Sequence, residues 1–191
     1  MEVNINTNLY GTTMAIGSMD VETLFGICKI YTFADVCYKN YVIAIWYGNL
    51  DSDILYTRLH SSCVTSESLR SIDCDCVQQL NGAFKKIAKN GGILFYLLQE
   101  GRGCGFVGKA RGLMLTQHDT KLDTFQAYEK LGMKPDYRSY HNINEICHIL
   151  KLKEKKWVLL TNNPDKIRGF QDIGMKLERT ESIEFIYSEF V

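Results

Sequence analysis

In Cys76-Val-Gln-Gln-Leu-Asn-Gly-Ala-Phe-Lys-Lys-Ile-Ala-Lys-Asn-Gly-Gly-Ile-Leu-Phe-Tyr-Leu-Leu98, the spacing of apolar residues changes from helical to extended. Residues 76–89 place apolar side chains at helical intervals, and Asn90-Gly-Gly92 is a typical helix end. Residues 92–98 are then continuously apolar, which is typical of a buried strand. The stretch therefore predicts a helix followed directly by a central strand of an α/β fold.

The flanking sequence extends this pattern in both directions. Residues 41–47 and 54–59 are β-branched and aromatic runs that predict two strands, with a turn over 48–53. Downstream we expect helices over residues 106–116, 123–131, 144–152 and 164–173. A buried strand is expected over residues 156–161. Alternating strands and helices indicate the α/β class, with a mixed sheet flanked by helices. Residues 1–22 and 183–191 have no decisive periodicity and are left unassigned.

Length and composition restrict the organisation and the partners. The 191 residues include 46% hydrophobic side chains and two prolines, so we expect one compact domain over residues 1–191. The 22 basic and 22 acidic side chains balance, which argues against nucleic acid or an anionic membrane as the main partner. The apolar runs are far shorter than a membrane span, and no charged segment precedes an apolar leader, so we expect a soluble, cytoplasmic protein.

The most informative cysteines are Cys63, Cys74 and Cys76. The chain has seven cysteines, an odd number, which disfavours a full set of disulfides. Cys74 and Cys76 are too close to pair comfortably but can face one ion together with Cys63. Three thiolates with no fourth Cys or His close by favour a zinc site with one open position, and a metal with an open position activates water. The alternative is that all three are buried and behave as small hydrophobes.

A glycine-rich turn follows the predicted strand over residues 92–98. Gln99-Glu-Gly-Arg-Gly-Cys-Gly105 lies between this strand and the helix expected from residue 106. Phosphates often bind where a strand leads through such a turn into a helix. The turn therefore predicts a contact with a phosphorylated ligand.

Five motifs occur in one order: Arg58-Leu-His-Ser-Ser-Cys63, Cys74-Asp-Cys76, Gln99-Glu-Gly-Arg102, Asp136-Tyr-Arg138 and Leu160-Thr-Asn-Asn-Pro164. Together they resemble GTP cyclohydrolase II over roughly residues 23–182. The resemblance implies a hydrolase that opens the imidazole ring of GTP and releases formate and pyrophosphate, giving a ribosylaminopyrimidine 5′-phosphate for riboflavin biosynthesis. It also implies one Zn²⁺ per subunit, Mg²⁺ with the triphosphate, and a homodimer.

The resemblance assigns roles to individual residues. It makes Cys63, Cys74 and Cys76 the zinc ligands, with water in the fourth position. It places the substrate contacts at Arg58, His60, Ser61, Ser62, Gln79, Glu100, Gly101, Arg102, Thr124, Thr161 and Lys166. A carboxylate at Glu100 would favour guanine over adenine by accepting from its amine or N1. A lysine at the start of the helix beginning at Pro164 suits a phosphate.

Asp136 and Arg138 match the family's Asp-x-Arg pair. The usual proposal for the family makes this arginine a nucleophile on the α-phosphorus, with the aspartate as its base. A guanidinium with a pKa above about 12 is a poor nucleophile, whereas a cation that clamps the departing phosphates needs no deprotonation. Either role makes Arg138 essential.

The chain departs from the family pattern at three places. Ser62 replaces a glutamate, Gly103-Cys104 replaces Asn-Ile, and Leu113 replaces a tyrosine that is a candidate for proton transfer. Leucine cannot relay a proton, so the reaction could stop at the 5-formylamino pyrimidine. The departures also leave room for a diverged purine nucleotide substrate or for a catalytically silent nucleotide-binding zinc module.

Side chains outside the motifs receive more modest predictions. Tyr128, Tyr137 and Tyr140 could compensate for the missing tyrosine or simply pack. Cys104 is either a fourth thiolate or a bystander. The cysteines in apolar segments, Cys28, Cys37 and Cys147, are expected in the core. The histidines outside the motifs, His118, His141 and His148, receive no role.

Overall fold

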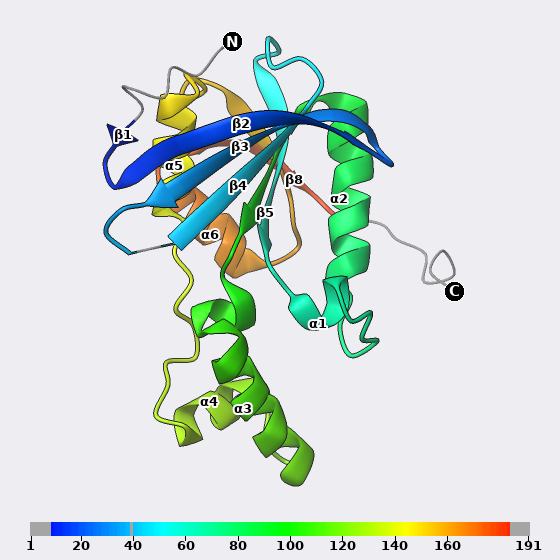
Figure 1. The fold of residues 1–191 in the computed structure, drawn as a ribbon, viewed down its shortest axis with the longest axis vertical. Helices are drawn as coiled ribbons and strands as arrows, with labels where there is room; N and C mark the ends of the chain where they lie inside the picture. Colours follow the sequence, from blue (N-terminus) through cyan, green and yellow to red (C-terminus); the bar gives the residue numbers. More distant parts are fainter. Residues whose placement is uncertain (1–8, 39, 184–191) are drawn as a thin grey trace.

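Eight strands form one mixed sheet in the computed structural model, which describes residues 9–38 and 40–183 (Figure 1). Their order is β1-β2-β3-β4-β6-β5-β7-β8. Neighbours from β1 to β6 pair antiparallel, whereas β6, β5, β7 and β8 are parallel. The strands are β1 (Leu9–Tyr10), β2 (Thr13–Thr23), β3 (Gly26–Asp35), β4 (Asn40–Tyr47), β5 (Ile54–Ser61), β6 (Gly92–Leu97), β7 (Lys156–Leu160) and β8 (Lys176–Glu181). The predicted α/β class with a mixed sheet is confirmed.

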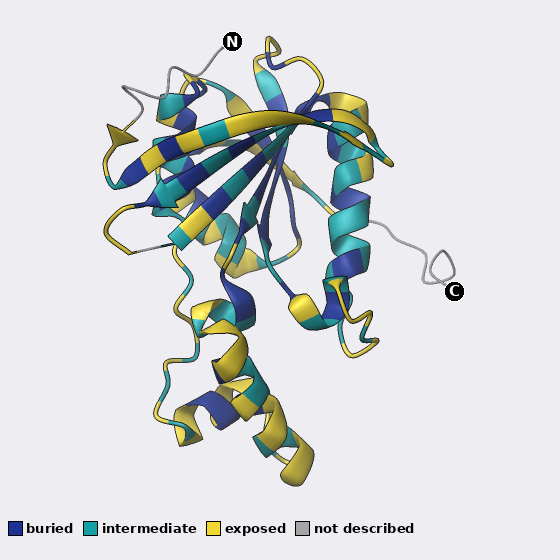
Figure 2. Ribbon diagram, viewed as in Figure 1, coloured by how far each residue is buried: buried dark blue, intermediate teal, exposed yellow. Residues whose placement is uncertain are grey.

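Helices cover both faces of the sheet. They are α1 (Val64–Glu67), α2 (Cys76–Asn90), α3 (Gly105–His118), α4 (Thr124–Lys130), α5 (His141–Ile149) and α6 (Pro164–Asp172), with a 3₁₀ turn, η2 (Glu100–Gly103). Ala83 and Ile87 of α2 pack on one face, and Ile146 of α5 and Phe170 of α6 pack in the larger core on the other. Helices α3 and α4 project away from the sheet and are largely exposed (Figure 2). Within the described residues, no helix is both long and apolar enough to cross a membrane.

The stretch from residue 76 to residue 98 forms the predicted helix and central strand, α2 and β6. Gly91 ends the helix with φ 81°, and Gly92 follows with φ 155°. A Cβ on Gly92 would lie 2.0 Å from the carbonyl oxygen of Tyr56, so only glycine allows β5 to approach this closely. The strands predicted over 41–47 and 54–59 also form, but β6 lies between them in the sheet. The helix expected over 144–152 begins and ends three residues earlier, as α5.

The sequence analysis missed the strands β1, β2, β3 and β8 and the short helix α1. In β2, the large apolar side chains of Met14, Ile16 and Met19 are exposed alongside polar ones, whereas the buried residues are Thr13 and Ala15. The alternation therefore gives no clear apolar face. Residues 1–8 and 184–191, which include most of the unassigned ends, lie outside the described residues.

The remaining cysteines divide between core and surface. Cys28 on β3 and Cys147 on α5 are buried, as predicted. The prediction for Cys37 was wrong, because this thiol is exposed. Cys37 follows the end of β3, where the backbone turns away from the core and its amide donates to Asp35 at 3.0 Å.

The parallel strands bring the sequence motifs together. β5 leads into Cys63, β6 into Glu100 and β7 into Thr161, and the three strands are adjacent and point the same way. Their carboxyl ends therefore meet at one edge of the sheet, the usual place for a ligand in such sheets.

Candidate active site

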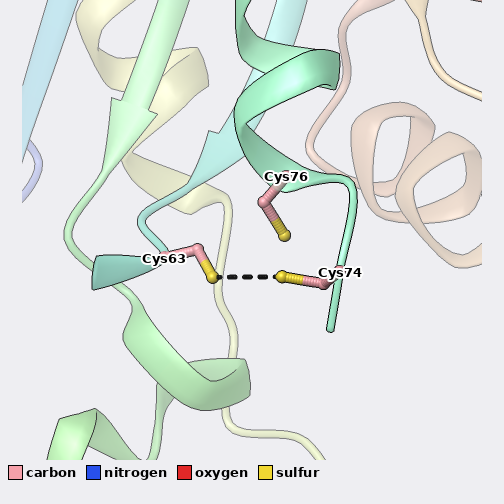
Figure 3. A group of neighbouring side chains, drawn as sticks. All are labelled: Cys63, Cys74 and Cys76. Carbon is pink, nitrogen blue, oxygen red and sulfur yellow. Dashed lines mark hydrogen bonds between the residues drawn. The ribbon is translucent and has the colours of Figure 1, made fainter. Parts of the chain in front are cut away.

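Three cysteines gather where β5 ends and α2 begins (Figure 3). The Sγ atoms of Cys63, Cys74 and Cys76 all lie within 4.8 Å of one another, and those of Cys63 and Cys74 are 3.7 Å apart. Among the described residues, this is the group of Cys, His, Asp and Glu side chains that could hold a metal ion. Three converging sulfurs that form no disulfide fit a thiophilic ion such as zinc.

Lys109 of α3 supplies positive charge beside these sulfurs. Its Nζ lies 3.2 Å from Cys63 Sγ, and it donates to Thr65 Oγ1 and Glu100 Oε1, both at 2.8 Å. Burial alone would raise the pKa of Cys63, but hydrogen bonds, including that from Lys109, lower it. Lys109 therefore stabilises the thiolate that a metal requires.

Cys104 is not part of this group. Its thiol donates to the carbonyl of Gly101 at 2.7 Å. The geometry therefore favours the bystander interpretation over a fourth metal ligand.

A cleft of about 360 Å³ opens beside the three cysteines. It is lined by every residue assigned from the resemblance except Asp136 and Thr161. The assigned residues in its wall are Arg58, His60, Ser61, Ser62, Cys63, Cys74, Cys76, Gln79, Glu100, Gly101, Arg102, Thr124, Arg138 and Lys166. Their individual roles stay predictions, but one surface brings them together.

A second cavity of about 660 Å³ shares part of this wall. Arg58, Gln79, Arg138 and Lys166 line both cavities, and Thr161 lines the second. The first turn of α6, which begins at Pro164 after its N-cap Asn163, also borders it. Three basic side chains and a helix N-terminus form an environment suited to a polyphosphate.

Glu100 is already engaged within the protein. Its Oε2 accepts from the Val64 amide at 2.8 Å, and its Oε1 accepts from Lys109 at 2.8 Å. The η2 turn that carries it places Gly101 and Arg102 at φ 59° and 60°. A guanine contact by Glu100 would use lone pairs that these two donors leave available.

Asp136 and Arg138 form a close ion pair before α5. Arg138 Nη2 donates to Asp136 Oδ2 at 2.5 Å, and Nε lies 3.0 Å from both carboxylate oxygens. Burial tends to lower the pKa of Arg138, but the bond to Asp136 outweighs it and the pKa rises. The pKa of Asp136 is lowered, because hydrogen bonds from Arg138 outweigh burial. This pairing favours a permanently charged guanidinium.

The loop carrying Arg138 is held by residues that the sequence analysis did not select. The amide of Gln99 accepts from the Ser139 nitrogen at 3.2 Å and donates to the Ser139 oxygen at 2.7 Å. His141, which had received no role, contacts Ser139 Oγ and the buried Asp35, each at 2.8 Å. Gln99 belongs to one of the five motifs, whereas nothing in the sequence links Asp35 to residue 141.

The buried Lys166 side chain has a pKa well below that of an ordinary lysine. Its Nζ donates to the Leu59 carbonyl at 2.9 Å. Burial, followed by the positive charges of Arg58 and Arg138, lowers its pKa to about 7. Near neutral pH a substantial fraction of the Lys166 side chain is therefore the uncharged amine until an anion binds nearby.

We expect tripolyphosphate to bind more weakly as the pH rises from 6 to 8. The bound anion favours the charged ammonium, so binding at pH 8 should take up about one proton per chain. Isothermal titration calorimetry in two buffers of different ionisation enthalpy measures this uptake. Lys166→Gln should reduce it to the part due to the phosphate itself, and exposed Lys153→Gln should leave it unchanged. Equal uptake in wild type and Lys166→Gln would refute the assignment.

Comparison with known proteins identifies the family. A sequence profile described as GTP cyclohydrolase II matches residues 14–182, beginning earlier than the predicted start near residue 23. The chain belongs to the GTP cyclohydrolase II family. It is 34% identical to GTP cyclohydrolase-2 of Shewanella sp. (strain ANA-3) over 164 residues, which cover 85% of this chain and 79% of the relative.

Two other similarities involve longer proteins. The riboflavin biosynthesis protein RibBA of Staphylococcus epidermidis is 35% identical over 187 residues, covering 98% of this chain and 44% of that protein. The crystal structure of RibBX, a two-domain 3,4-dihydroxy-2-butanone 4-phosphate synthase from A. baumannii, aligns with a TM-score of 0.48 and 15% identity. The aligned region covers 94% of the present chain and 42% of the RibBX chain.

Leu113, the main departure from the GTP cyclohydrolase II pattern, lies in the wall of the cleft. Of the three tyrosines considered as replacements, Tyr128 lines the same cleft and donates to the Gly101 carbonyl at 3.4 Å. Tyr137 borders a different cavity, and Tyr140 packs against Gly169 of α6. Tyr128 is therefore the one of the three that shares the cleft with Leu113, and its role as a replacement stays a prediction. Burial first and then Cys104 raise its pKa to about 12.

Proposed function

We propose that this member of the GTP cyclohydrolase II family opens the imidazole ring of GTP and releases pyrophosphate and formate, giving a ribosylaminopyrimidine 5′-phosphate. One observation carries the proposal: a wall containing Arg58 and Arg138 runs from the three cysteines to the basic cavity beside α6. A purine placed at the cysteine end therefore has its phosphates at the basic end. The family membership and the similarity to a protein named GTP cyclohydrolase-2 support the substrate.

Cys63, Cys74 and Cys76 would hold the zinc ion. Their clustered sulfurs and the adjacent Lys109 fit a thiolate-bound metal. When bound, zinc would supply an activated water for attack on C8 of the guanine. The protein supplies the shape of the cleft, and Leu113 and Tyr128 line its wall on the α3–α4 side.

The other residues would bind and orient the nucleotide. Arg58, Arg138 and Lys166 provide charges that match a triphosphate, with Mg²⁺ bound to its oxygens. Arg138, fixed by Asp136, would stabilise the charge that develops on the departing pyrophosphate. The backbone donors at the start of α6 would add to this field.

Leu113 favours a second candidate product. Formate is released only if the first ring-opened formamide is hydrolysed again. With leucine in the position of the proton-transferring tyrosine, the reaction could end at the 5-formylamino pyrimidine. The two candidates differ only in this last hydrolysis.

Incubating zinc-loaded protein with GTP and Mg²⁺ tests the proposal. Pyrophosphate, formate and the pyrimidine are followed together by coupled assay and mass spectrometry. Pyrophosphate with equal formate supports the full reaction, and pyrophosphate with the formamide supports the shortened one. If neither appears with GTP or another purine nucleotide, the proposed enzyme activity is wrong and a silent binding module is favoured.

Leu113→Tyr gives a directional prediction for the same assay. If the wild-type chain ends at the formamide, tyrosine should restore formate, by about 100-fold for a positioned acid–base group. Met114→Tyr, one residue along on the exposed surface of α3, is the matched control and should change nothing. Unchanged formate in Leu113→Tyr would mean that residue 113 does not set the end point.

We further propose a cytoplasmic homodimer with one zinc per subunit. Exposed apolar side chains on the projecting α3 and α4 support a self-association surface, notably Phe106, Val107 and Phe125. Light scattering checks the dimer, which should have about twice the 21.9 kDa mass of the chain.

A further inference from the structure

Glu67, a residue outside the five family motifs, lies beneath the cleft with its side chain only 11% exposed. Its Oε1 contacts His60 Nε2 at 2.8 Å and accepts from the Cys63 amide at 3.0 Å. Its Oε2 accepts from the Tyr96 hydroxyl at 2.5 Å. Three groups from β5, β6 and the start of α1 therefore converge on one carboxylate.

The bonds continue from His60 into the cleft wall. Arg58 Nε donates to His60 Nδ1 at 3.4 Å, and Arg58 Nη1 donates to the Leu160 carbonyl at 2.9 Å. Arg58 Nη2 donates to Gln79, which in turn donates to Asp75 at 2.8 Å. Asp75 lies between Cys74 and Cys76 in the sequence. The series of hydrogen bonds therefore starts at Glu67, which contacts Cys63, and ends at Asp75, beside the other two cysteines of the candidate metal site.

The direction of these bonds fixes the proton on His60. The carboxylate of Glu67 can only accept, so its 2.8 Å contact places a proton on His60 Nε2. The longer 3.4 Å contact from Arg58 Nε, which can only donate, agrees with this by making Nδ1 an acceptor. The proton of neutral His60 therefore lies on Nε2 and points to Glu67. Burial lowers the pKa of His60 and Arg58 lowers it further, while Glu67 acts in the opposite direction. Both nitrogens are occupied, which leaves His60 without a nitrogen for proton transfer to a ligand.

Negative charge below the cleft also balances its basic wall. Arg58 is 4% exposed and lies with Arg138 and Lys166 around the shared cavity. Glu67 is the carboxylate joined to Arg58 through a single imidazole. Removing it would leave His60, Tyr96 and the Cys63 amide without their acceptor, in a place where water has little access.

We propose that Glu67 is a positioning residue, which holds His60 as the neutral Nε2–H tautomer and through it orients Arg58 toward the substrate. The role for Arg58 rests on the proposed function, whereas the tautomer of His60 does not. Positioning of this kind acts on binding, so its loss should raise the KM for GTP more than it lowers kcat.

The tautomer is measured directly in the wild-type chain. Long-range ¹H–¹⁵N spectra distinguish the two neutral forms and the cation for each of the four histidines. The His60 signals are those that disappear in His60→Gln. We expect the Nε2–H form from pH 6 to 8. A proton on Nδ1, or an imidazolium that titrates in this range, would overturn the proposal.

Variants then test what Glu67 does. Glu67→Met keeps the side-chain length but removes the carboxylate that accepts from His60. It should therefore allow both neutral tautomers of His60 and raise the KM for GTP by about 10- to 100-fold, the range typical of removing the hydrogen-bond partner of a functional side chain. Glu67→Gln should stay close to wild type, since its oxygen still accepts from His60 and Cys63 while Tyr96 turns to accept from the amide. Glu145→Met is the matched control, because half-buried Glu145 accepts from the Thr12 amide at 3.2 Å and from Thr13 Oγ1 at 2.5 Å and lines neither the cleft nor the basic cavity.

The outcomes separate this proposal from the proposed function. A folded Glu67→Met with the wild-type tautomer and KM would overturn the positioning role. If Glu67→Met fails to fold, the wild-type tautomer and the rescue by glutamine decide. Wild-type protein that shows the expected tautomer but neither binds nor converts GTP would remove the proposed function and leave the hold of Glu67 on His60 supported.

Discussion

Serine in place of Cys76 is expected to abolish ring opening. Cys76 is one of three sulfurs within 4.8 Å of one another, and a serine hydroxyl is a far weaker ligand for a soft ion than a thiolate. Losing a direct ligand should cost more than the roughly 10–100-fold typical of outer partners. We therefore expect bound zinc to fall toward zero and the ring-opened product to fall by more than about 100-fold. Elemental analysis and product mass spectrometry measure the two effects.

The matched control is Cys37→Ser. Cys37 is exposed and follows β3, away from the three clustered sulfurs, so neither zinc content nor product should change. Incubating the wild-type protein with a chelator should reproduce the Cys76→Ser result, and added zinc should reverse it. Cys76→Ser that retains both zinc and ring opening would contradict the metal site.

The sequence predicted the part of the site that depends on local pattern. Apolar spacing gave α2 and β6, and Gly91-Gly92 marked the boundary between them. Once β5, β6 and β7 are parallel neighbours, motifs that follow each strand must meet at one edge. This geometric rule explains why residues as distant in sequence as Arg58 and Lys166 line one cleft.

The contacts between elements could not be predicted in the same way. Glu67 and Tyr96 lie on different elements, and no periodicity reports that they share a hydrogen bond. Lys109 received no role from the sequence, yet it bridges Cys63 and Glu100. Such partners depend on how α1 and α3 pack, which sequence spacing leaves open. β2 was missed for a related reason, because packing exposes its apolar side chains.

Alanine in place of Arg138 is expected to lower kcat for pyrophosphate release by about 100- to 1,000-fold, the cost of removing a preorganised group that stabilises developing charge. Asp136 binds the guanidinium through both oxygens and raises its pKa above the ordinary value despite burial. A guanidinium held in this way remains protonated and has no lone pair for attack on phosphorus. The structure thus favours a cationic clamp over a covalent nucleotidyl intermediate.

Arg138→Lys separates these two mechanisms. Lysine keeps the positive charge but loses the two-pronged contact with Asp136, so a clamp predicts activity between those of wild type and Arg138→Ala. Arg168→Ala is the matched control, because Arg168 is an exposed arginine of α6 paired with Asp165 and should leave kcat unchanged. Intact-mass spectra during turnover complete the test. A nucleotidyl adduct that forms on the wild type and is absent from Arg138→Lys would replace the clamp with covalent catalysis, whereas graded activity without an adduct is the result that the Asp136–Arg138 geometry predicts.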